Sequence, residues 1–175
     1  MNGFVLESAL QALVGLKLTD ASHAGNTRTF GFAQGTPRST DISQEYRLHL
    51  QCPWRLVRGD ELITGSLDWY EPEDADSGKI YGEDWDAAKG GSHQEAVLRF
   101  VFNDGQTERR YLVNATDVLL ATSFAADRLG GFHLHLSPDY TLSAFPAASR
   151  SEHWRLFQTS AGRHLVVQGG SARWE

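Results

Sequence analysis

The sequence contains a single cysteine, Cys52, and has no run of eighteen apolar residues. One cysteine cannot form an intramolecular disulfide, which is consistent with a reducing compartment. The missing apolar run excludes a transmembrane helix, and the N-terminal stretch lacks the basic start of a secretion signal. We therefore expect a cytoplasmic protein that does not associate with a membrane.

Basic residues are also scarce. Lys and Arg total 16 against 22 Asp and Glu, which gives a formal net charge of −6. The basic residues are scattered and form no stripe that could neutralise phosphates, so nucleic acid is not an expected partner. The chain also lacks a nucleophile elbow, a phosphate-binding loop and a dinucleotide fingerprint. We expect no cofactor, while catalytic carboxylates far apart in sequence, as in glycosidases, stay open.

The length of 175 residues and the hydrophobic content of 41% suit one domain over residues 1–175. Apolar residues recur at helical spacing from Phe4 to Val14, and Gly15 follows where a left-handed cap is expected. After this helix the period changes to two. The alternating segments are "LKLTDA", "TRTFGFA", "EYRLHLQC", "WRLV", "ELITGSL", "AVLRFVF", "TERRYLV", "DVLLATSFAAD", "GFHLHL", "TLSAF", "EHWRLFQ", "HLVVQ" and "ARW".

Ten or more short strands behind one N-terminal helix predict an α+β fold that is mainly antiparallel β. The strands would form a meander-rich sheet, a sandwich or a partly open barrel. The strongest hairpin signal is "NDG", between "AVLRFVF" and "TERRYLV".

A second hairpin joins "GFHLHL" to "TLSAF". Its apolar pattern favours a three-residue loop that includes Tyr140 and places Leu136 opposite Leu142 and Leu134 opposite Ala144. In that register His135 lies opposite Ser143, and His133 lies opposite Phe145.

Residues 68–86 combine carboxylates with four large aromatic side chains, and we call them the acidic aromatic segment. The calcium-loop pattern fails because Gly78 at its sixth position puts Ala75 at the third, where an oxygen ligand is needed. A solvated loop and an improvised weak cation site are the alternatives to a binding surface. We expect a surface for a basic protein, since such surfaces use aromatic anchors and steering charges. The anchors would be Trp69, Tyr70, Tyr81 and Trp85, and the charges Asp68, Glu71, Glu73, Asp74 and Asp76.

His133 and His135 are two residues apart on a predicted strand and point the same way, as two zinc ligands can. The facing strand offers no third ligand, so we expect two half-exposed histidines, with a metal site as the alternative. His49 and Cys52 are three apart and face opposite sides of a strand, so they cannot share a metal. Cys52 is expected to be a small buried hydrophobe rather than a reactive thiol.

The C-terminal strands repeat the alternation. Trp154 and Leu156 share one face and are predicted core residues, while Arg155 lies on the other face. Gly169 and Gly170 predict a tight turn that folds "SARWE" back as an edge strand, with Trp174 covering the core.

The motifs "EYRLHLQCPWRLV", "ITGSLDWY", "EHWRLF" and "LVVQGGSARW" resemble those of a family of small bacterial proteins of unknown function. The ending "YTLSAFPAASRSEHWRLF…VVQGGSARW" is also similar to the close of immunity or accessory proteins found beside bacterial toxins. This resemblance implies binding rather than catalysis.

The sequence therefore predicts a non-catalytic protein-binding domain that uses the acidic aromatic segment, and an immunity-like role is one form that such binding takes. The alternatives are an enzyme or a small-ligand or metal-binding protein that uses His133 and His135, with His49 as a further candidate. A third is a structural protein that self-associates through its last strand, so the protein would be a monomer or a homodimer.

Overall fold

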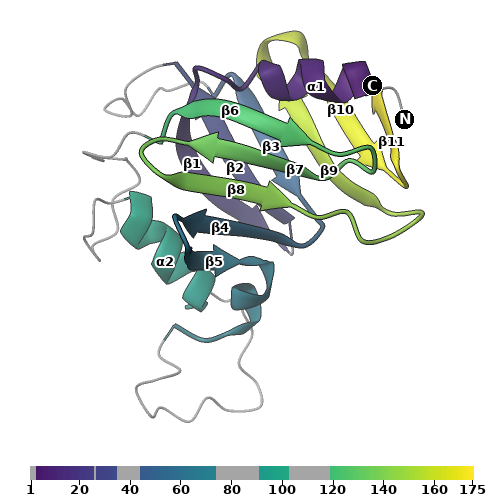
Figure 1. Ribbon diagram of the computed structural model, residues 1–175. Helices are drawn as coiled ribbons and strands as arrows, with labels where there is room; N and C mark the ends of the chain where they lie inside the picture. The colour runs from purple at the N-terminus through teal and green to yellow at the C-terminus, as the bar shows by residue number, and fades with distance from the viewer. Residues whose placement is uncertain (1–2, 26, 35–43, 74–90, 103–118) are drawn as a thin grey trace.

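The computed structural model describes residues 3–25, 27–34, 44–73, 91–102 and 119–175. Within these ranges the chain forms two α-helices and eleven strands, arranged as two antiparallel sheets (Figure 1). The sequence-based expectation of an α+β fold that is mainly antiparallel β is confirmed. The described strands form two sheets and not a closed barrel, and a second helix is present beside the predicted N-terminal one.

The larger sheet has the order β1-β2-β3-β9-β10-β11, and the smaller sheet has the order β5-β4-β8-β7-β6. The strands of the larger sheet are β1 (Lys17–Ala24), β2 (Thr27–Ala33), β3 (Tyr46–Leu50), β9 (Glu152–Gln158), β10 (Arg163–Gln168) and β11 (Ser171–Trp174). Those of the smaller sheet are β4 (Trp54–Arg58), β5 (Glu61–Gly65), β6 (Ala121–Ala126), β7 (Phe132–Leu136) and β8 (Tyr140–Ala144). The helices are α1 (Gly3–Gln11) and α2 (His93–Phe102), with short 3₁₀ turns η1 (Ser66–Tyr70) and η4 (Thr159–Ala161).

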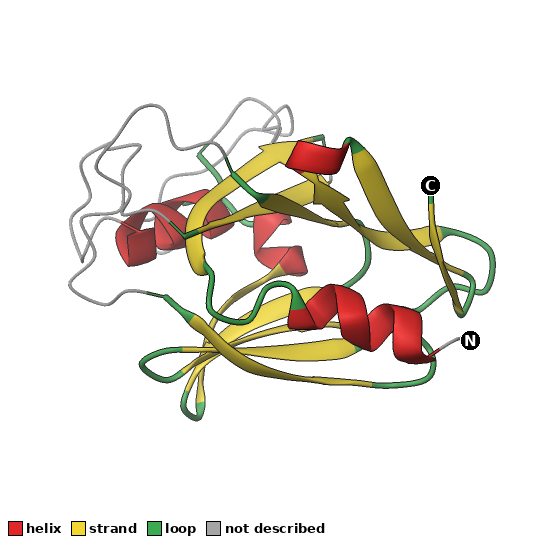
Figure 2. Cartoon of the chain, turned by 90° about the horizontal axis from the view of Figure 1, so that it is seen from above, coloured by secondary structure: helices red, strands yellow, loops and turns green. Residues whose placement is uncertain are grey.

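The two sheets form two layers, and their inward faces make the core (Figure 2). Strand β7 illustrates how a strand contributes to this core, because its apolar residues are buried while the histidines between them are exposed. The largest fully buried side chains come from both layers, and they are Trp154, Phe30, Phe32 and Phe132.

Each helix bridges two edge strands of the layered sheets. Helix α1 contacts β11 and β6, which are edge strands of the larger and the smaller sheet. Helix α2 contacts β1 and β5, the opposite edge strands, and also η1. Because α2 bridges these edges, β1 and β5, which are far apart in the sequence, both lie beside the same helix.

The sequence predicted a strand for the segment "AVLRFVF". In the structure this segment is part of helix α2. The reason is a helix start at Ser92, whose Oγ accepts a hydrogen bond of 3.3 Å from the backbone N–H of Glu95. Gln94, Leu98 and Phe102 then recur every four residues and are buried. The predicted hairpin over residues 96–113 is therefore wrong in its first arm, and its second arm lies outside the described residues.

The histidine hairpin β7–β8 has a different register from the predicted one. Leu134 pairs with Leu142 and His133 with Ser143, while Tyr140 pairs with Leu136 and so belongs to the strand. The predicted register is offset by two residues, which keeps each side chain on its expected face. The loop therefore consists of residues 137–139.

Other local predictions are confirmed. Gly15 has a φ of +90°, although α1 itself ends earlier, at Gln11. The β10–β11 turn has φ values of +53° at Gly169 and +77° at Gly170, as a two-residue hairpin turn requires. Trp154 and Leu156 are fully buried, and Trp174 packs on the core from the edge strand. None of the described helices has the length and apolar character needed to span a membrane.

Candidate functional site

The acidic aromatic segment is described only over its first residues. Trp69, Tyr70, Glu71 and Glu73 are placed, whereas four of the predicted site residues lie outside the described residues. These four are Asp74, Asp76, Tyr81 and Trp85. The geometry of the site is therefore built from the start of the segment and from the elements that it meets.

The described residues of the segment have different environments. Tyr70 is 61% exposed, whereas Trp69 is only 7% exposed, which is not the open position expected of a surface anchor. Asp68 accepts hydrogen bonds from the hydroxyl of Thr64 (2.8 Å) and the N–H of Gly65 (3.1 Å), so it fixes the start of η1. Glu73 forms an ion pair of 3.0 Å with Arg99 of α2.

Trp69 packs on two polar residues of the larger sheet. The ring of His23, on β1, lies 4.3 Å from the indole, centroid to centroid. The guanidinium carbon of Arg28, on β2, lies 5.6 Å from the centre of the indole, within cation–π range. Trp69 thus connects η1 to the ends of β1 and β2.

These residues line a pocket of about 190 Å³, which we call the Arg28 pocket. Its walls come from five parts of the chain: β1, β2, the β3–β4 connection with the start of β4, η1, and α2. The residues that these parts contribute include His23, Arg28, Cys52, Trp54, Trp69 and Gln94. Its described lining contains no Asp or Glu.

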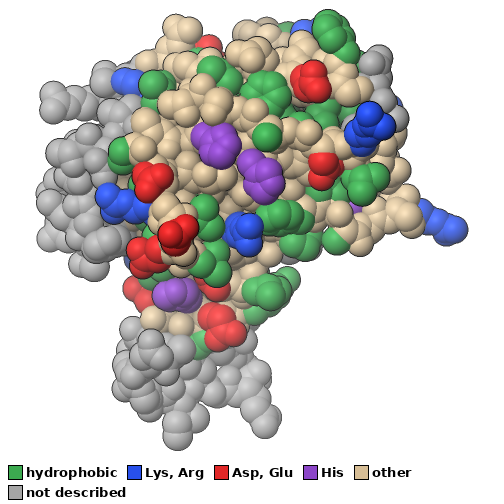
Figure 3. All heavy atoms as spheres, in the orientation of Figure 1, with side chains coloured by type: hydrophobic (Ala, Val, Ile, Leu, Met, Phe, Trp, Pro, Cys, Tyr) green, Lys and Arg blue, Asp and Glu red, His purple; other side chains and the backbone are tan. Residues whose placement is uncertain are grey.

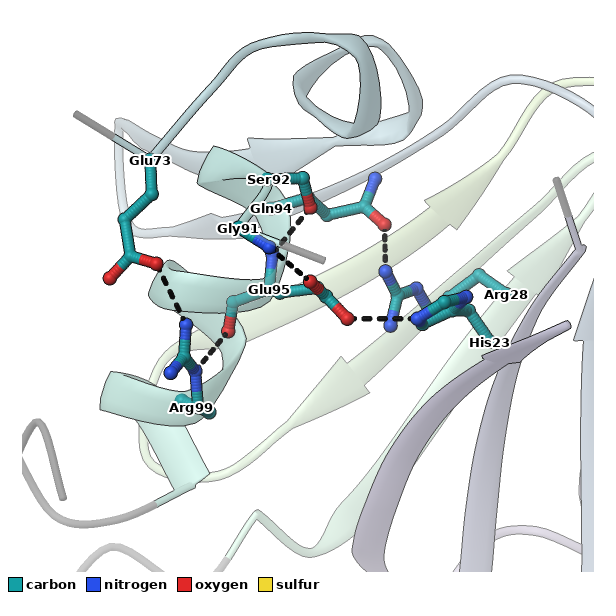
Figure 4. Close-up of polar contacts among 8 residues, drawn as sticks. All are labelled: His23, Arg28, Glu73, Gly91, Ser92, Gln94, Glu95 and Arg99. Atoms are coloured by element: carbon teal, nitrogen blue, oxygen red, sulfur yellow. Dashed lines mark hydrogen bonds and ion pairs between the residues drawn. The ribbon is translucent and has the colours of Figure 1, made fainter. Parts of the chain in front are cut away.

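Arg28 is the only Lys or Arg in that described lining, and it is 3% exposed. Its Nη2 donates to Oε1 of Gln94 (Figure 4), and Nε2 of Gln94 donates in turn to the carbonyl of Gly65 (2.6 Å). Nε of Arg28 is buried and has no hydrogen-bond partner among the described residues. Burial lowers the pKa of Arg28 to about 10, although the charges of Glu95 and Asp20 raise it. The guanidinium is therefore still charged at neutral pH.

His23 lies beside Arg28 and contacts α2 (Figure 4). Its Nε2 is 2.8 Å from Oε1 of Glu95, and the other oxygen of Glu95 accepts a hydrogen bond from the N–H of Gly91 (3.2 Å). Nδ1 of His23 is buried without a partner. Glu95 therefore orients the imidazole, and the helix start at Ser92 orients Glu95.

Cys52 is buried in the wall of this pocket, as its position after Leu48 and Leu50 predicted. Burial raises the pKa of its thiol to about 11. A thiol needs a lowered pKa to act as a nucleophile at neutral pH, so this environment favours a structural role.

The histidines predicted as the alternative site lie elsewhere, on the exposed face of the smaller sheet. Figure 3 shows two histidines side by side on that face. Nδ1 of His133 is 2.8 Å from the hydroxyl of Ser143, and Nδ1 of His135 is 3.1 Å from that of Thr141. A search of the described ranges finds no group of three metal-ligating side chains, so the metal site stays a prediction without a third ligand.

His49 lies on the outer face of the larger sheet, away from both sites. It pairs across β3 and β9 with Arg155, which forms a two-pronged ion pair with Glu152 at 2.6 and 2.7 Å. Burial lowers the pKa of His49, and Arg155 lowers it further. This arrangement brings His49 to neither Cys52 nor the two histidines of β7.

Three polar residues of the Arg28 pocket, His23, Arg28 and Gln94, and the Glu95 that holds His23 were not among the predicted site residues. One signal was present, because Arg28 stands two and four residues before Phe30 and Phe32 and so shares their inward face. A second was "SHQE", a capping box at Ser92 that places Gln94 and Glu95 in the first turn of a helix.

Comparison with protein-family models, with curated proteins and with solved structures finds no significant match in any of the three. The resemblances seen in the sequence therefore stay predictions, and what the site does must be argued from its own residues.

Proposed function

We propose that this protein is a non-catalytic binding protein whose recognition site is the Arg28 pocket together with the exposed start of the acidic aromatic segment. The observation that carries the proposal is an open apolar rim on a pocket that contains the buried guanidinium of Arg28. Leu67 is 76% exposed and Tyr70 is 61% exposed, and both line the pocket.

The rim is held in place before any partner arrives. Leu67 and Tyr70 belong to η1, which is fixed by the Asp68 cap on one side and by buried Trp69 between them. A backbone segment that is already fixed loses little conformational entropy on binding, and this improves affinity.

The charge near the rim supports a basic protein as the partner. Glu71 is exposed directly after Tyr70 and forms no ion pair with another described residue. Carboxylates at the edge of an interface speed association with a basic surface, while the buried contacts supply the affinity. Glu73 contributes less in this proposal because Arg99 already neutralises it.

The test is affinity capture from the native lysate with three immobilised proteins. These are the wild type, the double variant Leu67→Ser/Tyr70→Ala, and Leu129→Ser as the matched control. Leu129 is 68% exposed but lies in the β6–β7 turn, outside the pocket.

We expect one protein to be retained by the wild type and by Leu129→Ser and lost from the double variant, because only the double variant removes the rim. Equal retention by all three proteins would contradict the proposed site. No retention by the wild type would contradict a protein partner.

A further inference from the structure

Building on the proposed function, we infer that the group bound in the Arg28 pocket is the carboxylate of an apolar acid, held by the guanidinium of Arg28. The inference starts from a charge that is buried without a counterion. Arg28 is 3% exposed, its Nε has no partner in the described part of the chain, and the acceptor on its Nη2 is the neutral amide of Gln94.

The described residues do not supply that counterion. None of their ion pairs includes Arg28. The two carboxylates that raise the pKa of Arg28 already have other partners. Glu95 is bonded to His23, and Asp20 accepts a hydrogen bond from Gln44. An unpaired buried charge is costly, and a bound anion would remove that cost.

A single negative charge fits the pocket better than two. One guanidinium can neutralise one carboxylate, whereas a phosphate dianion at the same place would keep a second charge without a partner on Arg28. A carboxylate is also planar and accepts parallel hydrogen bonds from an arginine edge, and the unpartnered Nε lies on such an edge.

The rest of the ligand would meet apolar walls. Trp54, Trp69 and Pro53 line the pocket, with Leu67 and Tyr70 at its rim. The volume of about 190 Å³ is that of a small organic group, since apolar cavities of roughly 150 Å³ accommodate benzene. The expected ligand is thus a carboxylate with one aromatic ring, either as a free acid or as the C-terminal residue of a protein.

The probe is 3-phenylpropionate, compared at pH 7 with 3-phenylpropanamide, which has the same shape but no charge. Binding is measured by calorimetry and by the fluorescence of the pocket tryptophans. We expect the acid to bind at least about tenfold more tightly than the amide, because a charge-assisted hydrogen bond is lost in the amide.

Two variants assign that preference to Arg28. Arg28→Met removes the charge and should abolish the difference between acid and amide, while Arg28→Lys keeps the charge without Nε and should reduce it. Arg55→Met is the matched control, because Arg55 is an exposed arginine of β4 outside the pocket lining and should leave the preference unchanged. The wild-type comparison stands even if Arg28→Met does not fold.

A second pair of probes separates the two sources of the carboxylate. The tripeptide Ala-Ala-Phe is compared with its C-terminal amide. Tighter binding of the tripeptide than of 3-phenylpropionate points to a protein C-terminus that also contacts the rim, and weaker binding points to a free acid. In both cases the acid must bind more tightly than its amide.

Equal affinity for acid and amide, no binding of either, tighter binding of inorganic phosphate, or a preference that persists in Arg28→Met would each overturn the inference. These outcomes are independent of the capture experiment. A partner lost with Leu67→Ser/Tyr70→Ala but no acid preference would leave the proposed function standing and remove only the carboxylate.

Discussion

Arg28 occupies an inward position of β2, in line with Phe30 and Phe32, where an apolar residue is the usual choice. Among the described residues its guanidinium contacts the amide of Gln94 and the face of Trp69, while Glu95 and Asp20 act on its charge without forming an ion pair with it. A residue in such a costly position is a candidate for binding, since stability alone favours an apolar replacement there.

The burial of Cys52 in the pocket wall can be tested by the reactivity of its thiol. With a pKa of about 11 against an ordinary 9.0, the thiolate fraction at pH 8 falls about 100-fold. We expect native protein to react with iodoacetamide at least that much more slowly than urea-unfolded protein, as followed by intact mass. Because the folded pKa is raised, the stabilising contribution of Cys52 is complete below pH 9 and decreases as pH rises toward 11. Equally fast labelling of the folded and unfolded protein would show that the thiol is not shielded.

Individual site residues could be predicted from the sequence only in part. Tyr70 and Glu71 are exposed beside the pocket, as a binding surface requires. The buried position of Trp69 could not be anticipated, because it depends on His23 and Arg28, more than forty residues earlier in the chain. Such contacts are set by tertiary packing and leave no local pattern.

At the scale of elements, helix α2 carries the polar half of the site. It places Gln94 on Arg28 and Glu95 on His23, and both residues lie in its first turn. The position of the helix start therefore determines whether the pocket is assembled.

This dependence can be measured by Ser92→Ala, which removes the side-chain acceptor for the N–H of Glu95. We expect the free energy of unfolding to fall by about 1 kcal/mol, the usual cost of a lost helix cap. Urea denaturation gives the value, and Ser160→Ala, at an exposed serine of η4, should change it by less than about 0.5 kcal/mol. An unchanged stability of Ser92→Ala would mean that the cap does not determine the helix start.

Most strands were predictable because alternation of apolar and polar residues specifies a half-buried strand, as in β7 and β9. Helix α2 was not, since "AVLRFVF" is apolar enough for either structure and is followed by a turn sequence that suggested a hairpin. The "SHQE" start was the deciding signal. The β7–β8 register was mispredicted because two registers that differ by two residues bury the same face.

At the scale of the whole molecule, Trp154 joins the two layers. It belongs to β9 of the larger sheet, its Nε1 donates to the carbonyl of Gly130 (2.7 Å), and its ring meets Phe132 of the smaller sheet edge-on at 5.2 Å. A fully buried side chain shared in this way couples the stability of one sheet to that of the other.

We therefore expect Trp154→Phe to lower the free energy of unfolding by about 2–3 kcal/mol, from a cavity and an unpaired carbonyl. Far-UV circular dichroism and tryptophan fluorescence should report one shared midpoint, as in a two-state transition. Trp174→Phe, on edge strand β11, is the control and should cost less because Trp174 is only partly buried. Midpoints that separate in Trp154→Phe would show that the two sheets unfold independently.

The two ends of the described chain lie at the same end of the molecule, and α2 lies at the opposite end (Figures 1 and 2). The contact between α1 and β11 accounts for this arrangement. Gln94 of α2 lines the Arg28 pocket. A tag, a surface tether or a reporter domain attached at either end would therefore point away from the pocket. Such attachments should leave ligand access unobstructed, which suits the molecule to immobilised formats and to biosensors that detect occupancy through the pocket tryptophans.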